Sequence, residues 1–117
     1  MIDILEYCRM KACSTPHKRG EYRHHCVILD NKGRIVSEAK NSYSKTHPVM
    51  ARASAKLGLV KEYAHAEMLA LVRAKGKGVK LVVVRVDSKG DLAQSMPCVV
   101  CQELIKQAGI KSVEHST

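Results

Sequence analysis

Two short motifs place metal-binding side chains in separate parts of the chain, so any fold must bring the motifs together. The first is His65-Ala66-Glu67 and the second is Pro97-Cys98-Val99-Val100-Cys101. One imidazole and two thiolates supply three protein ligands, the number with which a catalytic zinc site keeps its fourth tetrahedral position open. The glutamate beside the histidine is left over for proton transfer. We therefore expect a fold that holds the two motifs against each other.

The spacing within each motif predicts where its residues lie on helices. Cys98 and Cys101 are three residues apart, so on a helix they share one face and can bind one ion. Pro97 suits the first helical position, where its missing amide hydrogen costs nothing. A helix that begins there directs its free amides at the sulfurs and favours the thiolate form. His65 and Glu67 are predicted in the opening turn of the preceding helix, from which both can face the ion.

Two other interpretations of the cysteine pair stay open. A redox C-x-x-C pair follows a strand in a thioredoxin-like unit, whereas Ala93-Gln94-Ser95-Met96 is predicted to form a loop. A purely structural zinc site normally has four protein ligands, and Cys26 or another histidine would have to supply the fourth. The carboxylate of Glu67 has no use in such a site, which favours the catalytic interpretation.

The chain alternates predicted helices and strands. The turn Asp30-Asn31-Lys32-Gly33 predicts a hairpin, the valine-rich run at 79–86 indicates a strand buried on both faces, and Gly76 suits a left-handed helix cap. Residues 41–48 are predicted to form a loop. We predict helices at 2–13, 49–57, from 65 to near 76 and from 97 to 109, and strands at 22–29, 34–39, 79–86 and 111–115.

H-x-E followed by P-C-x-x-C, in this alternating order, resembles the zinc-dependent cytidine and deoxycytidylate deaminase superfamily, which also includes tRNA adenosine deaminases and polynucleotide-editing deaminases. The resemblance covers the chain from the predicted hairpin to the last strand. It implies a single deaminase domain over 1–117 with a three-layer α/β/α cytidine-deaminase-like fold and a mixed central sheet of four to five strands. The family usually has a fifth strand, and four are counted here. Either the sheet edge is short or a partner subunit covers it, and a homo-oligomer is expected because many members form one.

The resemblance also implies a mechanism. Zinc held by His65, Cys98 and Cys101 would make hydroxide available near neutral pH, and the hydroxide would attack C4 of cytosine or C6 of adenine. Glu67 would move a proton from the water to the ring nitrogen and later to the departing ammonia.

Three further residues are candidates for substrate binding by the same resemblance. The backbone near Ala66 would contact the base edge, as its counterpart does in relatives. Asn41 follows the second strand, where relatives often place an asparagine that contacts sugar or base; a plain loop-forming role is the alternative. His47 would stack on the base or meet phosphate, with a solvent-exposed loop histidine as the alternative.

The charge of the chain bears on its partner. Twenty Lys and Arg against eleven Asp and Glu give a net charge of +9, which attracts phosphate on a free nucleotide or along a polynucleotide. A solvated basic surface without a nucleic-acid partner explains the charge as well. Single-strand binders stack bases on aromatic rings, and this chain has no Phe or Trp. Its rings are Tyr7, Tyr22, Tyr43 and Tyr63.

Three functions follow as hypotheses. The first is a zinc deaminase of a cytosine nucleoside or nucleotide, with deoxycytidylate as the first substrate to test. The second is a deaminase of cytosine or adenine in single-stranded DNA or RNA, including tRNA. The third is a zinc-binding module of the same fold without turnover, which leaves Glu67 without a chemical use.

Hydropathy and the positions of cysteine and histidine bear on the cellular compartment and on a second metal site. No apolar run approaches the eighteen residues that cross a membrane, and the first residues lack the basic-then-apolar order of a secretory signal. With five cysteines, an odd number, this predicts a cytoplasmic protein without a membrane partner. A group of cysteines and histidines near the N-terminus matches no compact zinc spacing, so buried Cys and exposed His are favoured over an extra zinc. These residues are Cys8, Cys13, His17, His24, His25 and Cys26.

Overall fold

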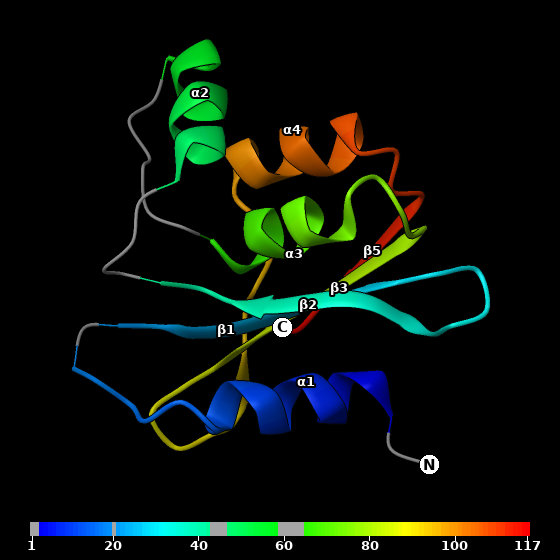
Figure 1. Cartoon of the computed structure of the whole chain (residues 1–117). Helices are drawn as coiled ribbons and strands as arrows, with labels where there is room; N and C mark the ends of the chain where they lie inside the picture. The colour runs from blue at the N-terminus through cyan, green and yellow to red at the C-terminus, as the bar shows by residue number, and fades with distance from the viewer. Residues whose placement is uncertain (1–2, 20, 43–46, 59–64) are drawn as a thin grey trace.

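A central mixed sheet separates α1 on one face from α3 and α4 on the other (Figure 1). A computed structural model describes the chain except residues 1–2, 20, 43–46 and 59–64. Its helices are α1 (Ile4–Cys13), α2 (Pro48–Lys56), α3 (Ala66–Ala74) and α4 (Val99–Gln107). Its strands are β1 (Arg23–Leu29), β2 (Ile35–Lys40), β3 (Lys80–Val86), β4 (Leu92–Ala93) and β5 (Ser112–His115). The predicted three-layer α/β/α architecture is confirmed.

The sheet has five strands within the described residues, so the predicted four to five strands are confirmed, and one of the five is not among the four counted in the sequence. β1 lies between β2 and β3 and pairs antiparallel with both. The other edge of β3 is shared: β4 pairs antiparallel with its last two residues, and β5 pairs parallel with residues 80–83. The prediction of a loop at residues 93–96 is therefore wrong at Ala93, which belongs to β4. A two-residue strand is too short for the alternation by which strands are recognised in a sequence.

Strand residues alternate between two cores. Cys26 and Ile28 of β1 pack toward α3, whereas Val27 and Leu29 pack toward α1. β3 does the same with consecutive residues 81–84, all of them fully buried, so the prediction of a strand covered on both faces is confirmed. Each buried valine or leucine side chain contributes about 1.5–3 kcal/mol, and this burial fixes which strand residues face α3 and α4.

Several helix boundaries differ from the prediction, and three of them have a local cause. α2 begins at Pro48, one residue inside the predicted loop, because His47 caps it. α4 begins at Val99 instead of Pro97, because Cys98 has the extended backbone of an N-cap residue. α3 ends at Ala74, and its C-cap residue Lys75 has a left-handed backbone (φ 53°). Gly76, the predicted cap, is the second of two residues with positive φ (81°).

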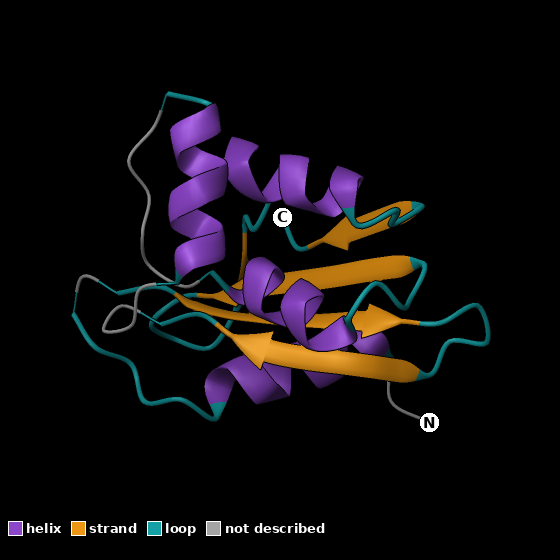
Figure 2. Ribbon diagram, turned by 45° about the horizontal axis from the view of Figure 1, so that its top comes forward, coloured by secondary structure: helices purple, strands orange, loops and turns teal. Residues whose placement is uncertain are grey.

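The starts of α3 and α4 lie at the same end of the sheet as the start of β1 and the end of β2 (Figures 1 and 2). This end brings together segments that are far apart in the sequence. None of the described helices has the length and apolar character needed to cross a membrane.

Candidate metal centre

Two helix N-termini position the three predicted ligands. His65 is the N-cap residue of α3, Cys98 is the N-cap residue of α4, and Cys101 lies in the first turn of α4. The two helices are held together by a buried cluster that includes Met50, Met68, Val100 and Cys101. His65 therefore stands just before the opening turn in which the sequence placed it, and Pro97 precedes the cap. Both helices still direct their free amides at the site.

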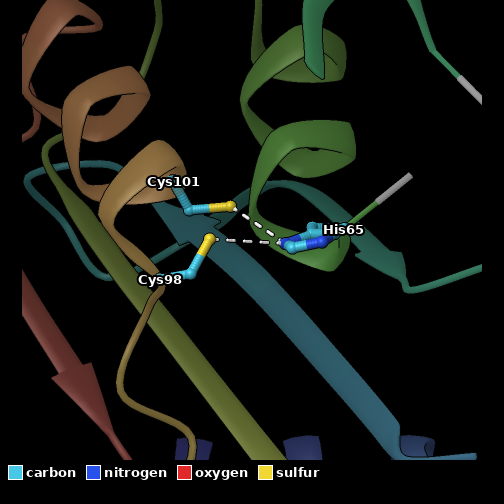
Figure 3. Close-up of side chains that lie close together, drawn as sticks. All are labelled: His65, Cys98 and Cys101. Atoms are coloured by element: carbon cyan, nitrogen blue, oxygen red, sulfur yellow. Dashed lines mark hydrogen bonds between the residues drawn. The ribbon is translucent and has the colours of Figure 1, made fainter. Parts of the chain in front are cut away.

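The ligand atoms converge as a zinc site requires. The His65 Nδ1 atom lies 3.6 Å from Cys98 Sγ and 3.4 Å from Cys101 Sγ (Figure 3), and all three ligand atoms lie within 4.8 Å of one another. Tetrahedral bonds of about 2.1 Å to nitrogen and 2.3 Å to sulfur put the two ligand atoms roughly 3.6 Å apart. The residues present therefore fit Zn²⁺, and they leave one coordination position without a protein ligand.

The two sulfurs differ in their affinity for protons. Hydrogen bonds from Cys101 and His65 lower the pKa of the Cys98 thiol to about 3, against the opposing effect of burial. The pKa of the Cys101 thiol is raised, because the thiol is hydrogen-bonded to Cys98 and the side chain is buried. Zinc binds the thiolate form of both cysteines, so zinc binding would release any proton that the pair holds.

Glu67 supplies a buried carboxyl group beside this centre. It is the second residue of α3 and its side chain is 5% exposed. Burial raises the pKa of Glu67, while its own backbone amide and His65 act in the opposite direction. A carboxyl with a raised pKa gives up and takes back a proton near neutral pH more readily than an exposed one, which suits general acid–base work.

No fourth protein ligand joins the group among the residues that the structure describes. In the part of the chain that the structure describes, His65, Cys98 and Cys101 are the one cluster of metal-binding side chains. Cys26 is fully buried in β1 and lies outside the cluster. It therefore does not supply the fourth ligand that a purely structural zinc site would need. The cysteines and histidines near the N-terminus likewise form no second cluster among these residues.

A pair of buried serines, which the sequence analysis missed, secures the segment before Cys98. The Ser95 hydroxyl donates to the Val83 carbonyl oxygen at 2.9 Å and accepts from the Ser116 amide at 2.9 Å. The Ser95 amide in turn donates to the Ser116 carbonyl oxygen at 2.9 Å. No local signal in the sequence connects residues so far apart.

The three candidate substrate residues have structural roles of their own. The Asn41 side chain accepts from the His24 amide and donates to the Tyr22 carbonyl oxygen, both at 3.0 Å, and so extends the β1–β2 pairing. The His47 Nδ1 atom accepts from the Val49 amide at 3.1 Å. Ala66 is fully buried as the first residue of α3. Their contacts with substrate stay predictions.

His24 and Arg85, which the sequence analysis did not select as substrate residues, also belong to this end of the sheet. They lie opposite each other in the β1–β3 pairing, and the Arg85 guanidinium lies 4.5 Å from the centre of the Tyr22 ring. Alternation in a strand predicts which face each occupies, but the register that pairs them does not follow from the sequence.

Of the other tyrosines, Tyr7 lies on the α1 face, where its hydroxyl donates to the Glu38 carboxylate at 2.9 Å. It is therefore not available for stacking at the metal centre. Tyr43 and Tyr63 lie outside the described residues.

Comparisons with known proteins agree with this geometry. Residues 4–117 match the family model described as the cytidine and deoxycytidylate deaminase zinc-binding region. The cytidine deaminase from Burkholderia pseudomallei has a similar structure, with 17% sequence identity and a TM-score of 0.59 over 100% of this chain and 85% of that chain. A mutant cytidine deaminase from Mycobacterium tuberculosis has 21% identity and a TM-score of 0.50, over 98% of this chain and 87% of that chain. The sequence matches none of the curated proteins with which it was compared. At these identities the structural likeness supports the fold, and the family match covers nearly the whole chain.

Proposed function

Because this chain belongs to the cytidine and deoxycytidylate deaminase zinc-binding family, we propose that it hydrolyses the exocyclic amino group of a cytosine nucleoside or nucleotide. Deoxycytidylate is the first substrate to test. The observation that carries the proposal is the convergence of His65, Cys98 and Cys101 beside a buried carboxyl group, Glu67. A site that only held a metal for stability would have no use for that carboxyl.

The proposed chemistry divides between the ion and the protein. His65, Cys98 and Cys101 would hold a zinc ion, which would supply the Lewis acid that makes water nucleophilic near neutral pH. The oxygen of that water adds to C4, while Glu67 takes one of its protons and delivers it to the ring nitrogen next to C4. Glu67 then moves the second proton of the same oxygen to the amino group, which leaves as ammonia, and the C4 carbonyl that remains makes the ring uracil. Burial of Glu67 keeps bulk water from competing for the proton.

Three residues complete the proposed substrate site. The backbone of Ala66 contacts the base edge, Asn41 contacts the sugar or base, and His47 contacts the base or a phosphate. The position of Asn41 at the end of β2, bonded to the backbone of His24, supports this assignment. For His47, the Nδ1 atom is used as a helix cap, which leaves Nε2 for a ligand.

An ammonia-release assay tests the proposal. Zinc-loaded protein would be incubated separately with dCMP, cytidine, adenosine and a single-stranded oligonucleotide. We expect turnover of a free cytosine compound, and a loss of about 10²–10⁴-fold in Glu67→Gln with zinc still bound. Glu103→Gln is the matched control, because Glu103 bonds to Gln107 on an exposed part of α4. No turnover of any substrate by zinc-loaded protein would instead indicate a silent zinc-binding module.

The net charge of +9 favours a second candidate, deamination within single-stranded DNA or RNA, including tRNA. Turnover of the oligonucleotide alone, with binding that weakens steeply as salt rises, would select it.

The proposal also includes a homo-oligomer in the cytoplasm. Val113 on β5, at the edge of the sheet, is 41% exposed, which supports an interface there. All five cysteines are free thiols, which supports a reducing compartment.

A further inference from the structure

Three loops carry lysine side chains at the end of the sheet that lies away from the metal centre. They are the β1–β2 turn at 30–34, the α3–β3 loop at 75–79 and the α4–β5 loop at 108–111. Figures 1 and 2 show all three at the end where α3 and α4 finish, opposite the helix starts that hold His65 and Cys98. Each helix has nine residues, which at about 1.5 Å per residue separates its two ends by about 13 Å. The three loops therefore form a surface of their own, which we call the basic end.

Backbone hydrogen bonds hold the loops of the basic end side by side. The Val79 amide donates to the Leu29 carbonyl oxygen at 2.8 Å, which joins the α3–β3 loop to the residue before the β1–β2 turn. The Lys111 amide donates to the Val79 carbonyl oxygen at 2.8 Å, which joins the α4–β5 loop to the same point. Ile110 packs against buried core residues and anchors this third loop. The lysines of the basic end thus stand on loops that are fixed relative to one another.

The basic end carries more than half of the net charge of the chain. Over residues 30–34, 75–80 and 106–114, seven Lys and Arg against two acidic residues give a net charge of +5, out of +9 for the whole chain. Both acids are already paired, Asp30 with Arg34 and Glu114 with Lys80, each at 2.9 Å. The other five lysines are exposed and make no ion pair with any described residue. They are Lys32, Lys75, Lys77, Lys106 and Lys111.

Two of these five lysines have a structural role. Lys75 is the C-cap residue of α3 and Lys106 lies in the last turn of α4, where a positive charge stabilises a helix. Lys32, Lys77 and Lys111 lie outside the helices, one in each loop. Because their ammonium groups pair with no acidic group among the described residues, the fold gains no ion pair from them and a partner can bind them.

The chemistry of the basic end fits the outside of a nucleic acid duplex. Residues 30–34 and 75–78 contain no aromatic and no large apolar side chain. They offer no ring on which unpaired bases stack, and no apolar group that would enter a membrane or anchor a protein interface. A duplex keeps its bases stacked inside and presents phosphates, about one charge per 1.7 Å of its axis. Ammonium groups contact such phosphates without reading the base sequence.

We propose that the basic end binds double-stranded nucleic acid through its phosphates, with Lys32, Lys77 and Lys111 as contacts. RNA and DNA duplexes share this chemistry, so the test includes both. The basic end is separate from the metal centre. The inference therefore goes beyond the proposed deaminase function and does not depend on it.

Fluorescence anisotropy with short labelled duplexes, at a series of salt concentrations, tests the proposal on the zinc-loaded protein. We expect Lys32→Gln/Lys77→Gln/Lys111→Gln to weaken duplex binding at least about 10-fold at low salt. The slope of log Kd against log salt should become flatter by about 3, because each phosphate contact contributes about 0.9. Lys32→Arg/Lys77→Arg/Lys111→Arg keeps the charges and should bind as the wild type does. Each single Lys→Gln variant should flatten the slope by about 0.9, which tests the proposal even if the triple variant does not fold.

The matched control is Lys18→Gln/Lys56→Gln/Lys89→Gln, which removes the same number of exposed lysines from other parts of the surface. It should keep nearly the slope of the wild type. Equal weakening in the two glutamine triple variants would show that binding follows net charge alone, and this would overturn the proposal. A wild type that binds neither duplex would overturn it as well.

Competition experiments separate the basic end from the metal centre and from other partners. Excess dCMP should leave duplex binding unchanged, because a nucleotide at the metal centre would lie at the other end of α3 and α4. Displacement of the duplex by dCMP would contradict a separate site. Tighter binding of a single strand, of polyglutamate or of phosphatidylserine vesicles than of either duplex would assign the basic end to another class of partner and reject the proposal.

Discussion

Ser95→Ala tests whether the buried serine pair secures the segment that carries Cys98. Ser95 and Ser116 are each 4% exposed. The substitution removes two hydrogen bonds of the Ser95 hydroxyl, one to the Val83 carbonyl oxygen and one from the Ser116 amide. The Ser116 hydroxyl lies 2.8 Å from the Ser95 hydroxyl, and it is not counted as a third bond because it donates its one proton to the Ala93 carbonyl oxygen at 2.6 Å. At about 0.5–1.5 kcal/mol for each bond the sum is about 1–3 kcal/mol. The Ser116 amide retains a longer bond of 3.2 Å to the Val83 oxygen, so we expect the lower part of that range, about 1–2 kcal/mol.

Urea unfolding of the zinc-loaded protein would measure this loss in the free energy of unfolding. A change of about 1–2 kcal/mol corresponds to a decrease of roughly 4–8 °C in Tm for a domain of this size. Ser88→Ala is the control, because Ser88 is exposed in the β3–β4 turn and should change stability by less than about 0.5 kcal/mol. If Ser95→Ala is as stable as Ser88→Ala, the serine pair does not secure the segment and the reasoning is refuted.

Three further predictions concern other parts of the structure. Gly78→Ala should destabilise the fold by about 2 kcal/mol or more in urea unfolding, because Gly78 has φ +100° and an added Cβ would overlap Ile28; Gly33→Ala, with φ +80° and open space, should cost less. Burial lowers the pKa of His25, so the unfolded chain takes up a proton first as pH falls below about 6.5 and stability falls with it. In His25→Gln that part of the pH dependence should disappear from unfolding curves measured between pH 7 and 5, and an unchanged slope would contradict the assignment. Cys26→Ala should still bind one zinc per chain by elemental analysis, whereas loss of the ion would make Cys26 a ligand.

The candidate metal centre could be selected from the sequence because ligand chemistry restricts the residue types. His65, Cys98 and Cys101 could be selected from the sequence, since few side chains bind zinc and their spacing suits helix starts. The β1–β2 hairpin and the buried β3 strand followed from turn residues and from a run of valines.

Other features depend on contacts that no local pattern records. The pairing of Ser95 with Ser116 requires β5 to lie beside β3. The two-residue strand β4 forms because its backbone pairs with the last two residues of β3. Such features follow from strand order and register, which only the folded chain fixes.

Elemental analysis of protein purified without chelators tests the central claim most directly. We expect one zinc ion per chain in the wild type and in Cys13→Ala, a cysteine outside the cluster, and almost none in the His65→Ala/Cys98→Ala/Cys101→Ala variant. A wild type without zinc after zinc loading, or a triple variant that still holds one zinc per chain, would contradict the assignment of these three residues as the metal centre.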